Sequence, residues 1–265
     1  MRTAVGVKMN NDLISDRQQS IYEYICGKNF TAVNEISRAL EIKPSTVRRD
    51  LKILEKQKKI IAFHGGVSVD TGYEKYEFRT LKNAEEKKRI GARAAKLVDS
   101  NDAIYIGGGS TTYEFARALS LRGDLKNVLV VASSINAVSA FLQKSNFKVM
   151  IPGGEFNTIH ESMTSNIALE FMKTFYFKKA FVGTQAIDAH FGYTNPTFEL
   201  NELKKVIVSH AQRVILLCDH TKVGKADPFI TCDTDRIDMI ITDRSSKAAP
   251  MLEEIKNCGT EIIEV

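Results

Sequence analysis

The feature that most constrains the fold of this chain is the stretch 32–55, AVNEISRALEIKPSTVRRDLKILE, in which apolar residues recur at helical spacing on both sides of a short interruption. The interruption falls at 41–43, and Pro44 then suits the first turn of a helix, where a backbone N–H would lack an intrahelical partner. The apolar positions are Val33, Ile36, Leu40, Val47, Leu51 and Leu54. This pattern predicts two short amphipathic helices that share one small core across a tight turn.

The second of these helices carries two adjacent arginines, Arg48 and Arg49, near its start. Both lie off the apolar stripe, so the exposed face of the helix is polar and basic. A helix-turn-helix places such a face in the major groove of DNA, against base edges and phosphates. The residues of this region that we predict to contact DNA are Lys43, Ser45, Thr46, Arg48, Arg49 and Lys52.

The segments on either side complete a small domain. A preceding helix is predicted over about Asp16–Cys26, because Ser15 and Gln18 have the spacing of a capping box. Further along, a lysine-rich segment leads into an apolar run and then Gly65-Gly66, which permits a tight reversal between two strands. The sequence therefore predicts a winged helix-turn-helix, whose wing region adds three predicted DNA contacts, Lys58, Lys59 and His64.

Charge is distributed unevenly along the chain. Residues 1–64 contain 12 Lys and Arg against 7 Asp and Glu, whereas residues 65–265 contain 25 of each, so the net charge of +5 lies in the amino-terminal part. A locally basic module suits binding to the phosphate backbone of duplex DNA. The alternative is that a basic, solvated helix pair packs against the rest of the chain without binding DNA.

The length of the chain, 265 residues of which 43% are hydrophobic, exceeds that of one typical domain and predicts two. No apolar run approaches the ~18 residues needed to span a bilayer, and the first residues lack the apolar core of a signal peptide, so we expect a cytoplasmic protein. The cysteines Cys26, Cys218, Cys232 and Cys258 show no CxxC spacing, and the histidines show no HxH or HExxH spacing. We therefore expect reduced thiols, no metal site and no cofactor.

Beyond the amino-terminal part, apolar runs alternate with helical stretches. Residues 71–83 have no sustained apolar period and predict a partly ordered linker between a domain over 1–70 and a larger domain over 84–265. The apolar runs occupy 103–106, 128–132, 148–151, 179–183, 214–218 and 239–242. Such runs alternating with helices predict an α/β domain with a doubly wound, mostly parallel sheet that is covered by helices on both faces.

Loops at the carboxyl ends of such strands are the usual ligand-binding positions. The run 103–106 is followed by three glycines, Ser110, two threonines and then a helix. Glycines let the backbone approach an anion, hydroxyls donate, and the free N–H groups of a helix start point at the same place. This predicts a phosphate-binding loop formed by Gly108, Gly109, Ser110, Thr111 and Thr112. The alternative is a flexible turn with a Ser or Thr cap.

Other loops at the same edge of the sheet carry donors or charges. They provide the further predicted ligand contacts Ser133, Gly153, Gly154, Asp188, Asp219 and Lys222. Lys222 is the best candidate for a fixed positive partner of a phosphate, and Asp219 is available for sugar hydroxyls. A solvated Lys and an ordinary turn Asp are the competing interpretations of Lys222 and Asp188.

Several of these motifs occur together in one known family. Residues 42–51 match a signature close to V-S-x-x-T-I-R-R-D-L, residues 64–66 match an H-G-G wing, and the segments 109–112, 153–154 and 219–224 match a sensor domain. With these motifs the chain resembles the DeoR family of bacterial transcriptional regulators. The resemblance implies a winged helix-turn-helix followed by a domain similar to sugar-phosphate isomerases that senses phosphorylated sugars or related metabolites.

The chain departs from the family pattern at several positions. Lys43 stands where a Ser usually caps the recognition helix, which removes a cap worth typically ~1 kcal/mol and places a cation near DNA phosphate. Ala62 stands where the family often has an Arg, and Gly107 stands where it often has an Asp. Ser133-Ser134 replaces a Thr-Asn pair that often ends the second strand. The acidic residue that the family often places ahead of a Lys in a long later helix aligns with either Glu199 or Leu200.

Residues and resemblance together predict a ligand-controlled repressor of a carbohydrate-metabolism operon. We expect a homo-oligomer whose partners are double-stranded operator DNA and a phosphorylated sugar effector. One alternative is a sugar-phosphate isomerase or deaminase, which needs a positioned base such as Glu155, Asp188 or Asp219. Another is an architectural DNA-binding protein without a ligand.

Overall fold

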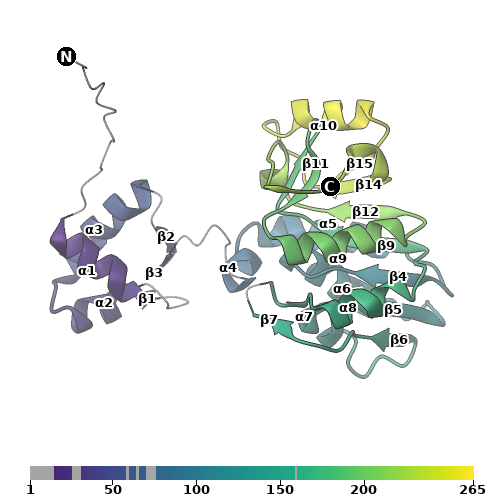
Figure 1. Ribbon diagram of the computed structural model, residues 1–265, viewed down its shortest axis with the longest axis horizontal. Coiled ribbons are helices and arrows are strands. Elements are labelled where there is room, and N and C mark those ends of the chain that lie inside the picture. Colours follow the sequence, from purple (N-terminus) through teal and green to yellow (C-terminus); the bar gives the residue numbers. More distant parts are fainter. Residues whose placement is uncertain (1–14, 26–30, 58–59, 64–65, 70–75, 159) are drawn as a thin grey trace, which may run out of the picture. The chain divides into compact units, whose positions relative to one another are not determined.

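The computed structural model of the chain describes residues 15–25, 31–57, 60–63, 66–69, 76–158 and 160–265. The chain divides into two compact units, residues 1–74 (unit 1) and residues 75–265 (unit 2), and each is described by itself. Figure 1 labels the elements along the chain. In the part of the chain that the structure describes, no helix is both long and apolar enough to cross a membrane.

Unit 1 is a winged helix-turn-helix. Its elements are α1 (Asp16–Ile25), β1 (Thr31–Ala32), α2 (Val33–Ala39), α3 (Pro44–Lys56), β2 (Ile60–Phe63) and β3 (Gly66–Val69). The strands form one antiparallel sheet in the order β1-β3-β2. The three helices and this sheet enclose a core that consists of Ile21, Ile25, Ile36, Val47, Leu51, Leu54, Ile60 and Val67. The fold predicted for this part of the chain is thereby confirmed.

The ends of the helices in unit 1 show the capping contacts that their residues predict. The Ser15 N–H donates to Gln18 Oε1 at 3.0 Å and the Gln18 N–H donates to Ser15 Oγ at 3.3 Å, so the capping box before α1 forms. Pro44 occupies the first turn of α3, and Lys43 at the N-cap provides no side-chain hydrogen bond. Glu41, in the turn between α2 and α3, has a φ of 54°, a left-handed conformation that non-glycine residues seldom adopt.

Unit 2 is built on a seven-stranded sheet in which every neighbouring pair of strands is parallel. In sheet order the strands are β15 (Glu261–Glu264), β14 (Met239–Thr242), β12 (Val214–Leu217), β9 (Lys179–Gly183), β4 (Ala103–Ile106), β5 (Val128–Ala132) and β6 (Phe147–Met150). The six predicted apolar runs all fall on strands of this sheet, which confirms the doubly wound α/β prediction. The seventh strand, β15, was not predicted because it is a short edge strand with glutamates at both ends.

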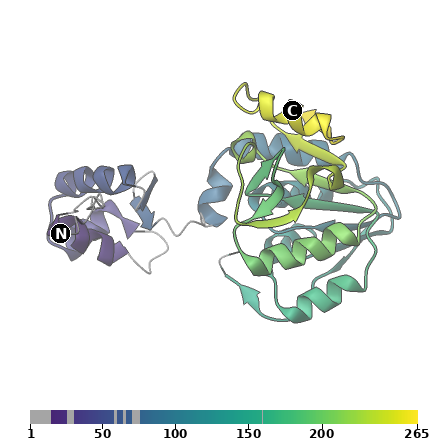
Figure 2. The ribbon, with the colours of Figure 1, turned by 45° about the horizontal axis from the view of Figure 1, so that its top comes forward.

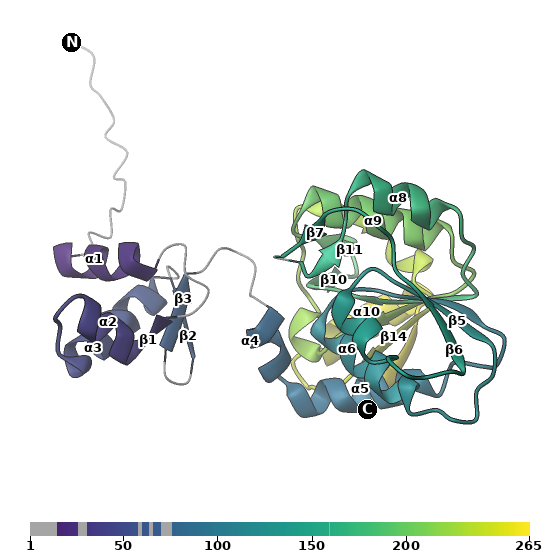
Figure 3. The same cartoon turned by 90° about the horizontal axis from the view of Figure 1, so that it is seen from below.

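Helices cover both faces of the sheet. They are α5 (Ala84–Ala95), α6 (Ser110–Ser120), α7 (Ile135–Ser139), α8 (Asn166–Lys173), α9 (Phe198–Ser209) and α10 (Ala249–Asn257). Helices α8 and α9 lie side by side on one face, whereas α5 and α6 lie on the other (Figures 2 and 3). Side chains alternate accordingly along β4, where Ile104 joins the core under α5 and α6 while Tyr105 joins the core under α8 and α9.

The order of the strands creates a switch point in the middle of the sheet. From β4 the chain proceeds through β5 and β6 toward one edge, and from β9 it proceeds through β12, β14 and β15 toward the other. The two series diverge between β4 and β9, which are hydrogen-bonded neighbours. In open parallel sheets, ligands bind outside the carboxyl ends of the strands at such a point.

Smaller elements surround the carboxyl edge of the main sheet. An antiparallel sheet joins β10 (Ala186–Asp188), β11 (Gly192–Asn195) and β13 (Phe229–Cys232), and a two-stranded ribbon joins β7 (Phe156–Asn157) to β8 (Ser162–Met163). Two short 3₁₀ helices, η1 (His220–Lys222) and η2 (Thr234–Arg236), complete the unit. Strands this short leave too few residues to establish a period of two, so sequence analysis did not find them.

The stretch predicted as a linker, 71–83, contains a helix. Helix α4 (Tyr76–Leu81) is part of unit 2, packs on α6, and has the side chain of Arg79 buried within the unit. The buried Lys87 Nζ donates to the backbone oxygens of Arg79 and Lys82 and so fixes the end of α4 to α5. Little more than one turn of helix cannot display an apolar period, which is why the sequence suggested a connector.

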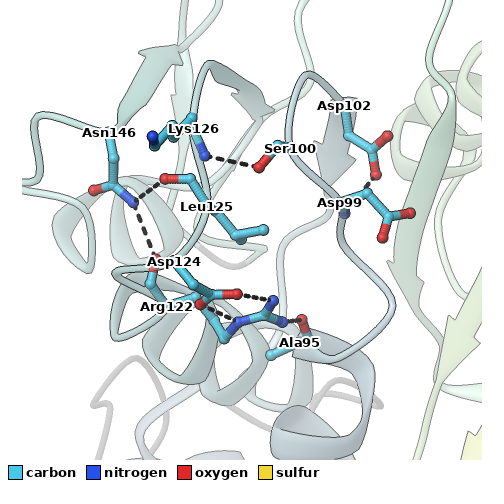
Figure 4. A network of polar contacts seen from close by, with 9 residues as sticks. All are labelled: Ala95, Asp99, Ser100, Asp102, Arg122, Asp124, Leu125, Lys126 and Asn146. Carbon is cyan, nitrogen blue, oxygen red and sulfur yellow. Dashed lines mark hydrogen bonds and ion pairs between the residues drawn. The ribbon is translucent and has the colours of Figure 1, made fainter.

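The amino ends of the central strands are tied together by polar contacts, and Figure 4 shows the network around Arg122. Arg122 pairs with Asp124 at 2.6 Å and donates to the backbone oxygen of Ala95 at 2.8 Å. Beside this network, Lys179 Nζ donates to the Leu97 oxygen and to carboxylate oxygens of Asp99 and Asp102, at 2.6 to 2.8 Å. Loops at this edge are therefore fixed by charge pairs within the unit.

Candidate functional site

In unit 1, the predicted DNA contacts lie on one side of α3. Val47 and Leu51 of this helix are buried in the core, whereas Arg48 and Arg49 are exposed. The set at the start of α3 is exposed apart from the half-buried Thr46, and it consists of Lys43, Ser45, Thr46, Arg48, Arg49 and Lys52. The arrangement leaves one continuous basic face of α3 available to a polyanion. Lys58, Lys59 and His64 lie outside the described residues.

Asp50, which follows the two arginines, has a structural role that sequence analysis missed. Its carboxylate is 1% exposed and receives Arg17 Nε at 2.6 Å and Arg17 Nη2 at 3.0 Å, with Gln18 Nε2 at 3.4 Å. The hydrogen bond from Arg17 lowers the pKa of Asp50 below its ordinary value, against the opposing effect of burial. The pair fixes the orientation of α3 against α1. A signal existed, because Asp50 falls on the apolar side of the helix, beside Val47 and Leu54.

A groove of about 470 Å³ runs along α3 beside the wing strands. Arg48, Lys52 and Glu55 line it from α3, and Ala62 and Val67 line it from β2 and β3. Two of the predicted DNA contacts therefore border a concave surface. Ala62, which replaces the Arg often found here in the family that the sequence resembles, contributes only a methyl group to this wall.

In unit 2, the predicted phosphate-binding loop lies at the switch point. Gly107 N–H donates to Phe181 O at 2.9 Å, which holds the end of β4 against β9. Gly109 precedes α6 with a φ of 137°, a conformation that favours glycine. Ser110, Thr111 and Thr112 are buried in the first turn of α6, where helix N–H groups have no intrahelical acceptor. The loop and the helix start therefore offer a preformed set of donors for an anion.

Gly108 and Ser133 are held close to the ribbon β7-β8. A Cβ on Gly108 would lie 2.8 Å from Ser162 Oγ, so a larger residue there would displace the Ser162 side chain. Ser133 Oγ is 2.8 Å from Tyr105 Oη and 3.1 Å from Ser162 Oγ, and the Ser133 backbone oxygen accepts from Met163 N–H at 2.8 Å. The side chain of Ser133 is therefore engaged within the unit, and Gly108 serves a close approach of protein to protein.

The other two predicted glycines behave as turn residues. Gly154 has a φ of 113°, and a Cβ there would lie 2.2 Å from Ser165 Oγ. A Cβ on the exposed Gly153 would meet nothing within 4 Å. Among the described residues, no hydrogen bond links either glycine to the loop at Gly109.

Asp219 and Lys222 lie beyond the carboxyl end of β12, in and before η1. Asp219 Oδ1 accepts from Asn83 Nδ2 and from Thr221 N–H, each at 3.0 Å. Burial alone would raise the pKa of Asp219, but the hydrogen bond from Thr221 and the charges of Lys222 and Lys87 lower it below its ordinary value. Lys222 Nζ donates to Gln185 Oε1 at 3.1 Å. An ionised carboxylate and a cation thus stand side by side at this edge.

Asp188 forms a turn. Its Oδ1 accepts from the N–H groups of His190 at 2.8 Å and Phe191 at 3.3 Å, which closes the reversal between β10 and β11. This geometry agrees with the turn interpretation that sequence analysis left open beside ligand binding. In the described part of the unit, no hydrogen bond joins the Asp188 carboxylate to the loop at Gly109.

Sequence analysis missed a buried lysine at the same switch point. Lys204 of α9 is 6% exposed, and its Nζ donates to Gly183 O at 2.9 Å and to Asn195 Oδ1 at 2.6 Å. Its ammonium also lies 5.0 Å from the ring centroid of Tyr193. No carboxylate of the described residues lies within ion-pair distance of it. The side chain is a cation held by neutral groups.

The surroundings of Lys204 oppose its charge. Burial, and then the nearby charge of Arg79, lower the pKa of Lys204 from its ordinary 10.5 to about 7, although Asp227 acts in the other direction. Sequence offered a signal, because Lys204 takes a place on the apolar stripe of α9 together with Leu200, Leu203 and Ile207. A charged residue on a buried stripe is unusual and indicates a function or a partner.

His160 belongs to the same cluster. It is 5% exposed, its Nε2 lies 3.0 Å from Thr197 Oγ1, and its backbone oxygen would be 3.7 Å from a Cβ on Gly108. Burial, followed by the charges of Lys204 and Arg79, lowers the pKa of His160 to about 4. The imidazole is therefore neutral near pH 7, and the positive charge of the cluster comes from Arg79 and Lys204.

Family models match both parts of the chain. Residues 17–72 match the DeoR-like helix-turn-helix domain, and residues 82–244 match the DeoR C terminal sensor domain.

Curated relatives extend over nearly the whole chain. The HTH-type transcriptional repressor GlcR of Bacillus subtilis is 28% identical over 86% of this chain and 88% of its own length. The putative aga operon transcriptional repressor of Escherichia coli O157:H7 is 26% identical over 95% and 94%. The glycerol-3-phosphate regulon repressor of Escherichia coli K12 is 23% identical over 86% and 90%.

Solved structures resemble the chain more distantly. The sorbitol operon regulator SorC from Klebsiella pneumoniae is 14% identical with a TM-score of 0.44, over 90% of this chain and 100% of its own. Ribose 5-phosphate isomerase A from Methanocaldococcus jannaschii is 19% identical with a TM-score of 0.40, over 53% of this chain and 55% of its own.

Proposed function

The chain belongs to the DeoR family of transcriptional regulators, and from that premise we propose that it represses a carbohydrate-metabolism operon under the control of a phosphorylated sugar. Unit 1 binds the operator, and unit 2 binds the effector. Three relatives that are named as transcriptional repressors, one of them of the glycerol-3-phosphate regulon, support this assignment.

The exposed face of α3 supports the operator-binding role. Arg48 and Arg49 lie side by side on a helix that Asp50 fixes in place through Arg17. A planar guanidinium binds two acceptors of a guanine or of a phosphate at once, so either arginine suits a base edge or the backbone. We assign Ser45 and Thr46 to phosphates, and Lys43 and Lys52 to the electrostatic part of binding.

One observation carries the effector assignment. Lys204 lies buried at the switch point, next to the loop that begins α6, where burial disfavours its positive charge. Gly183 accepts from Lys204 through its oxygen, and a Cβ on Gly183 would lie 3.5 Å from Gly108 O and from Thr112 Cγ2. Lys204 thus contacts the end of β9, and the loop follows the end of β4, so both lie at the strands that flank the switch point. A neutral sugar would leave the ammonium without a counter-charge, whereas a phosphate would supply one and accept from the N–H groups of α6.

The carboxylates of this edge favour a sensor over an enzyme. DeoR-family proteins are regulators of transcription and not enzymes. The pKa of Asp219 lies below its ordinary value and its carboxylate is held by Asn83 and Thr221, which does not suit a general base. The carboxylate of Asp188 is engaged by the turn that it closes. Binding without turnover is the function that these contacts support.

Control of DNA by a ligand requires that unit 1 bind differently in the two ligand states. We propose that the protein acts as a homo-oligomer, because paired recognition helices on a two-fold axis match operators with paired half-sites. Since its target is DNA, the proposal places its action in the cytoplasm.

The proposal is tested with the full-length protein in two steps. First, a duplex that wild-type protein selects from a random-sequence library serves as the DNA probe in mobility-shift titrations at fixed salt. Second, triose, pentose and hexose phosphates are screened for thermal stabilisation beside their unphosphorylated sugars, since a ligand of the native state raises the melting temperature. Stabilisation by a sugar phosphate alone, with a change in DNA affinity, is expected. Failure to select any duplex, or equal stabilisation by sugar and sugar phosphate, would contradict the proposal.

A further inference from the structure

Lys204 is held by two neutral acceptors and keeps one donor unused. Its Nζ donates to Gly183 O at 2.9 Å, at the end of β9, and to Asn195 Oδ1 at 2.6 Å, on β11. An ammonium has three N–H donors. Among the described residues, no third acceptor lies within hydrogen-bond distance of this ammonium. Lys204 is thus fixed in place by its neighbours, while one donor and the positive charge stay available to a ligand.

Gly183 places the ammonium at the predicted phosphate-binding loop. The oxygen of Gly183 accepts from Lys204, and a Cβ on Gly183 would lie 3.5 Å from Gly108 O and from Thr112 Cγ2. Tyr193 Oη donates to the same oxygen at 2.9 Å, and its ring centroid lies 5.0 Å from the ammonium. The strand end that binds Lys204 is therefore the one that packs against the loop.

The amide of Asn195 belongs to a chain of buried hydrogen bonds. Asn195 is 0% exposed, its Nδ2 donates to Thr231 Oγ1 on β13, and Thr231 Oγ1 donates to Asn201 Oδ1 at 2.7 Å. Asn201 Nδ2 donates in turn to Ile230 O at 3.2 Å. Asn201 lies on α9, three residues before Lys204, so the chain starts and ends on the same helix.

These hydrogen bonds fix which end of the Asn195 amide faces Lys204. A hydroxyl has one hydrogen to donate, and Thr231 donates it to Asn201, so Thr231 acts as an acceptor towards Asn195. The amide nitrogen of Asn195 therefore faces Thr231, and its oxygen faces the ammonium. A reversed amide would set an N–H group against a cation. The chain thus presents an acceptor to Lys204 that carries no full negative charge.

Lys179 shows what carboxylates do in the same place. It is buried as well, but its Nζ lies 2.7 Å from Asp99 Oδ2 and 2.8 Å from Asp102 Oδ2. A carboxylate satisfies a buried ammonium permanently, whereas an amide oxygen orients the ammonium and leaves its charge for an incoming anion.

We propose that Asn195 is the positioning residue of the effector site: its neutral amide oxygen holds Lys204 beside the loop at Gly109 without neutralising it, so that the phosphate of the effector supplies the counter-charge. This inference rests on the proposed function. It makes the neutral side chain at 195 the condition for anion binding at this edge of the sheet.

The test uses full-length protein with Asn195→Asp, Thr231→Val and the control Asn257→Asp. Asn257 is an exposed residue at the end of α10, so its substitution makes the same change of charge outside the site. Titration calorimetry measures binding of inorganic phosphate and of the sugar phosphate that most stabilises wild type. Melting curves measure the stability of each variant.

We expect Asn195→Asp to weaken binding of the sugar phosphate about ten- to hundredfold, the size of effect that loss of a charged hydrogen bond produces. Its melting temperature should equal or exceed that of wild type, because the new carboxylate pairs with Lys204. A merely structural role of Asn195 predicts the reverse, a lower melting temperature with normal affinity. Asn257→Asp should bind like wild type.

Thr231→Val tests the chain behind Asn195. Valine keeps the shape of threonine but has no hydroxyl, so the amide of Asn195 is no longer fixed with its oxygen towards Lys204. We expect binding about threefold weaker than in wild type, and no further loss when Thr231→Val is combined with Lys204→Met, because the chain acts through the lysine.

Wild-type affinity for the sugar phosphate in Asn195→Asp overturns the inference, and so does an equal loss from Thr231→Val with and without Lys204. Should Asn195→Asp not fold, the comparison of Thr231→Val in the two backgrounds decides alone. A wild-type protein that binds no sugar phosphate gives a different result, because it overturns the proposed function and the role of Asn195 with it.

Discussion

The cations assigned to DNA in unit 1 are exposed to solvent, whereas the cation assigned to the effector in unit 2 is buried. Arg48 and Arg49 are exposed on α3, whereas Lys204 is 6% exposed. An exposed cation attracts DNA over a distance but is screened by salt. A buried cation is little screened, yet its charge is opposed until a counter-charge arrives. DNA binding should therefore respond chiefly to salt, and effector binding chiefly to pH.

Lys179 is a buried cation that, unlike Lys204, is paired with carboxylates. Lys179 is as buried as Lys204, at 8% exposed, but it lies at the amino edge of the sheet with Asp99 and Asp102 as partners. Burial alone would raise the pKa of Asp102, but hydrogen bonds from Lys178 and Lys179 lower it. The two edges of one sheet thus hold a lysine that is already satisfied and a lysine that an anion can satisfy.

The largest effect is expected where the paired edge is broken. Asp102→Asn leaves the buried ammonium of Lys179 without its buried carboxylate partner, and should lower the free energy of unfolding by about 3–5 kcal/mol. Urea unfolding at pH 7 measures this change. Asp124→Asn is the control, because its pair with Arg122 is exposed and should contribute less than ~1 kcal/mol. Equal losses in both variants would remove the distinction between structural and available cations.

The next effect concerns the exposed cations. Arg48→Ala and Arg49→Ala should each weaken binding to the selected duplex by about 1–3 kcal/mol at a base contact, or reduce the salt slope by about 1 at a phosphate contact. Both variants should melt like wild type, because neither side chain belongs to the core. Lys88→Ala removes one charge from unit 2 and serves as the charge-matched control. Unchanged mobility-shift titrations at matched salt would refute the assignment of α3.

Lys204→Met tests the available cation. Replacing a buried charge by an apolar chain of similar length should leave the free energy of unfolding at pH 7 unchanged or higher. The same change should weaken binding of a sugar phosphate about tenfold or more, because a charged hydrogen bond is lost. The matched control is Lys205→Met, since Lys205 is exposed and pairs with Glu202 at 3.1 Å. A destabilised Lys204→Met variant with normal affinity would give Lys204 a structural role instead.

The paired and exposed cations also mark the limit of sequence analysis. Arg48 and Arg49 could be assigned from spacing, because a helix period directly separates buried from exposed positions. The loop at Gly109 could be placed because glycines and hydroxyls follow an apolar run. Asp50 and Lys204 are each a charged residue on the apolar stripe of a helix. That pattern could have indicated both buried groups, but only exposed residues were predicted as functional.

Other features depend on contacts between distant segments. Nothing local in the sequence places His160 against Thr197, Asn83 against Asp219, or Arg79 near Lys204. Likewise, Ser133 and Gly108 were predicted as ligand contacts from their position after strands, but Ser162 explains their close packing. Tertiary contacts decided these roles, and a linear pattern carries no record of them.

The smallest expected effect is the pH dependence of effector binding, and it follows from the sign of one pKa shift. The pKa of Lys204 is about 7 without ligand, and only the protonated amine attracts a phosphate. A sugar phosphate is already a dianion above its second pKa of about 6, so its own charge hardly changes above pH 7. Affinity should therefore fall roughly fivefold between pH 7 and 8, as the protonated fraction of Lys204 falls.

The groups that face Lys204 leave this interpretation open to a direct check. Arg79 on α4 carries a fixed charge, Tyr193 on β11 has a pKa well above its ordinary value, and His160, with a pKa of about 4, is already neutral at pH 7. The charge of Asp227 raises the pKa of Lys204, and burial raises the pKa of Asp227 itself. The pH dependence of effector binding should accordingly disappear in Lys204→Met and persist in Lys205→Met.

Stability should change with pH in the opposite sense to affinity. Between pH 7 and 10.5 the unfolded chain holds a proton on Lys204 that the folded chain lacks, so the free energy of unfolding rises with pH in that range. Affinity that stays constant from pH 7 to 8 while stability rises would mean that the buried amine does not contact the phosphate.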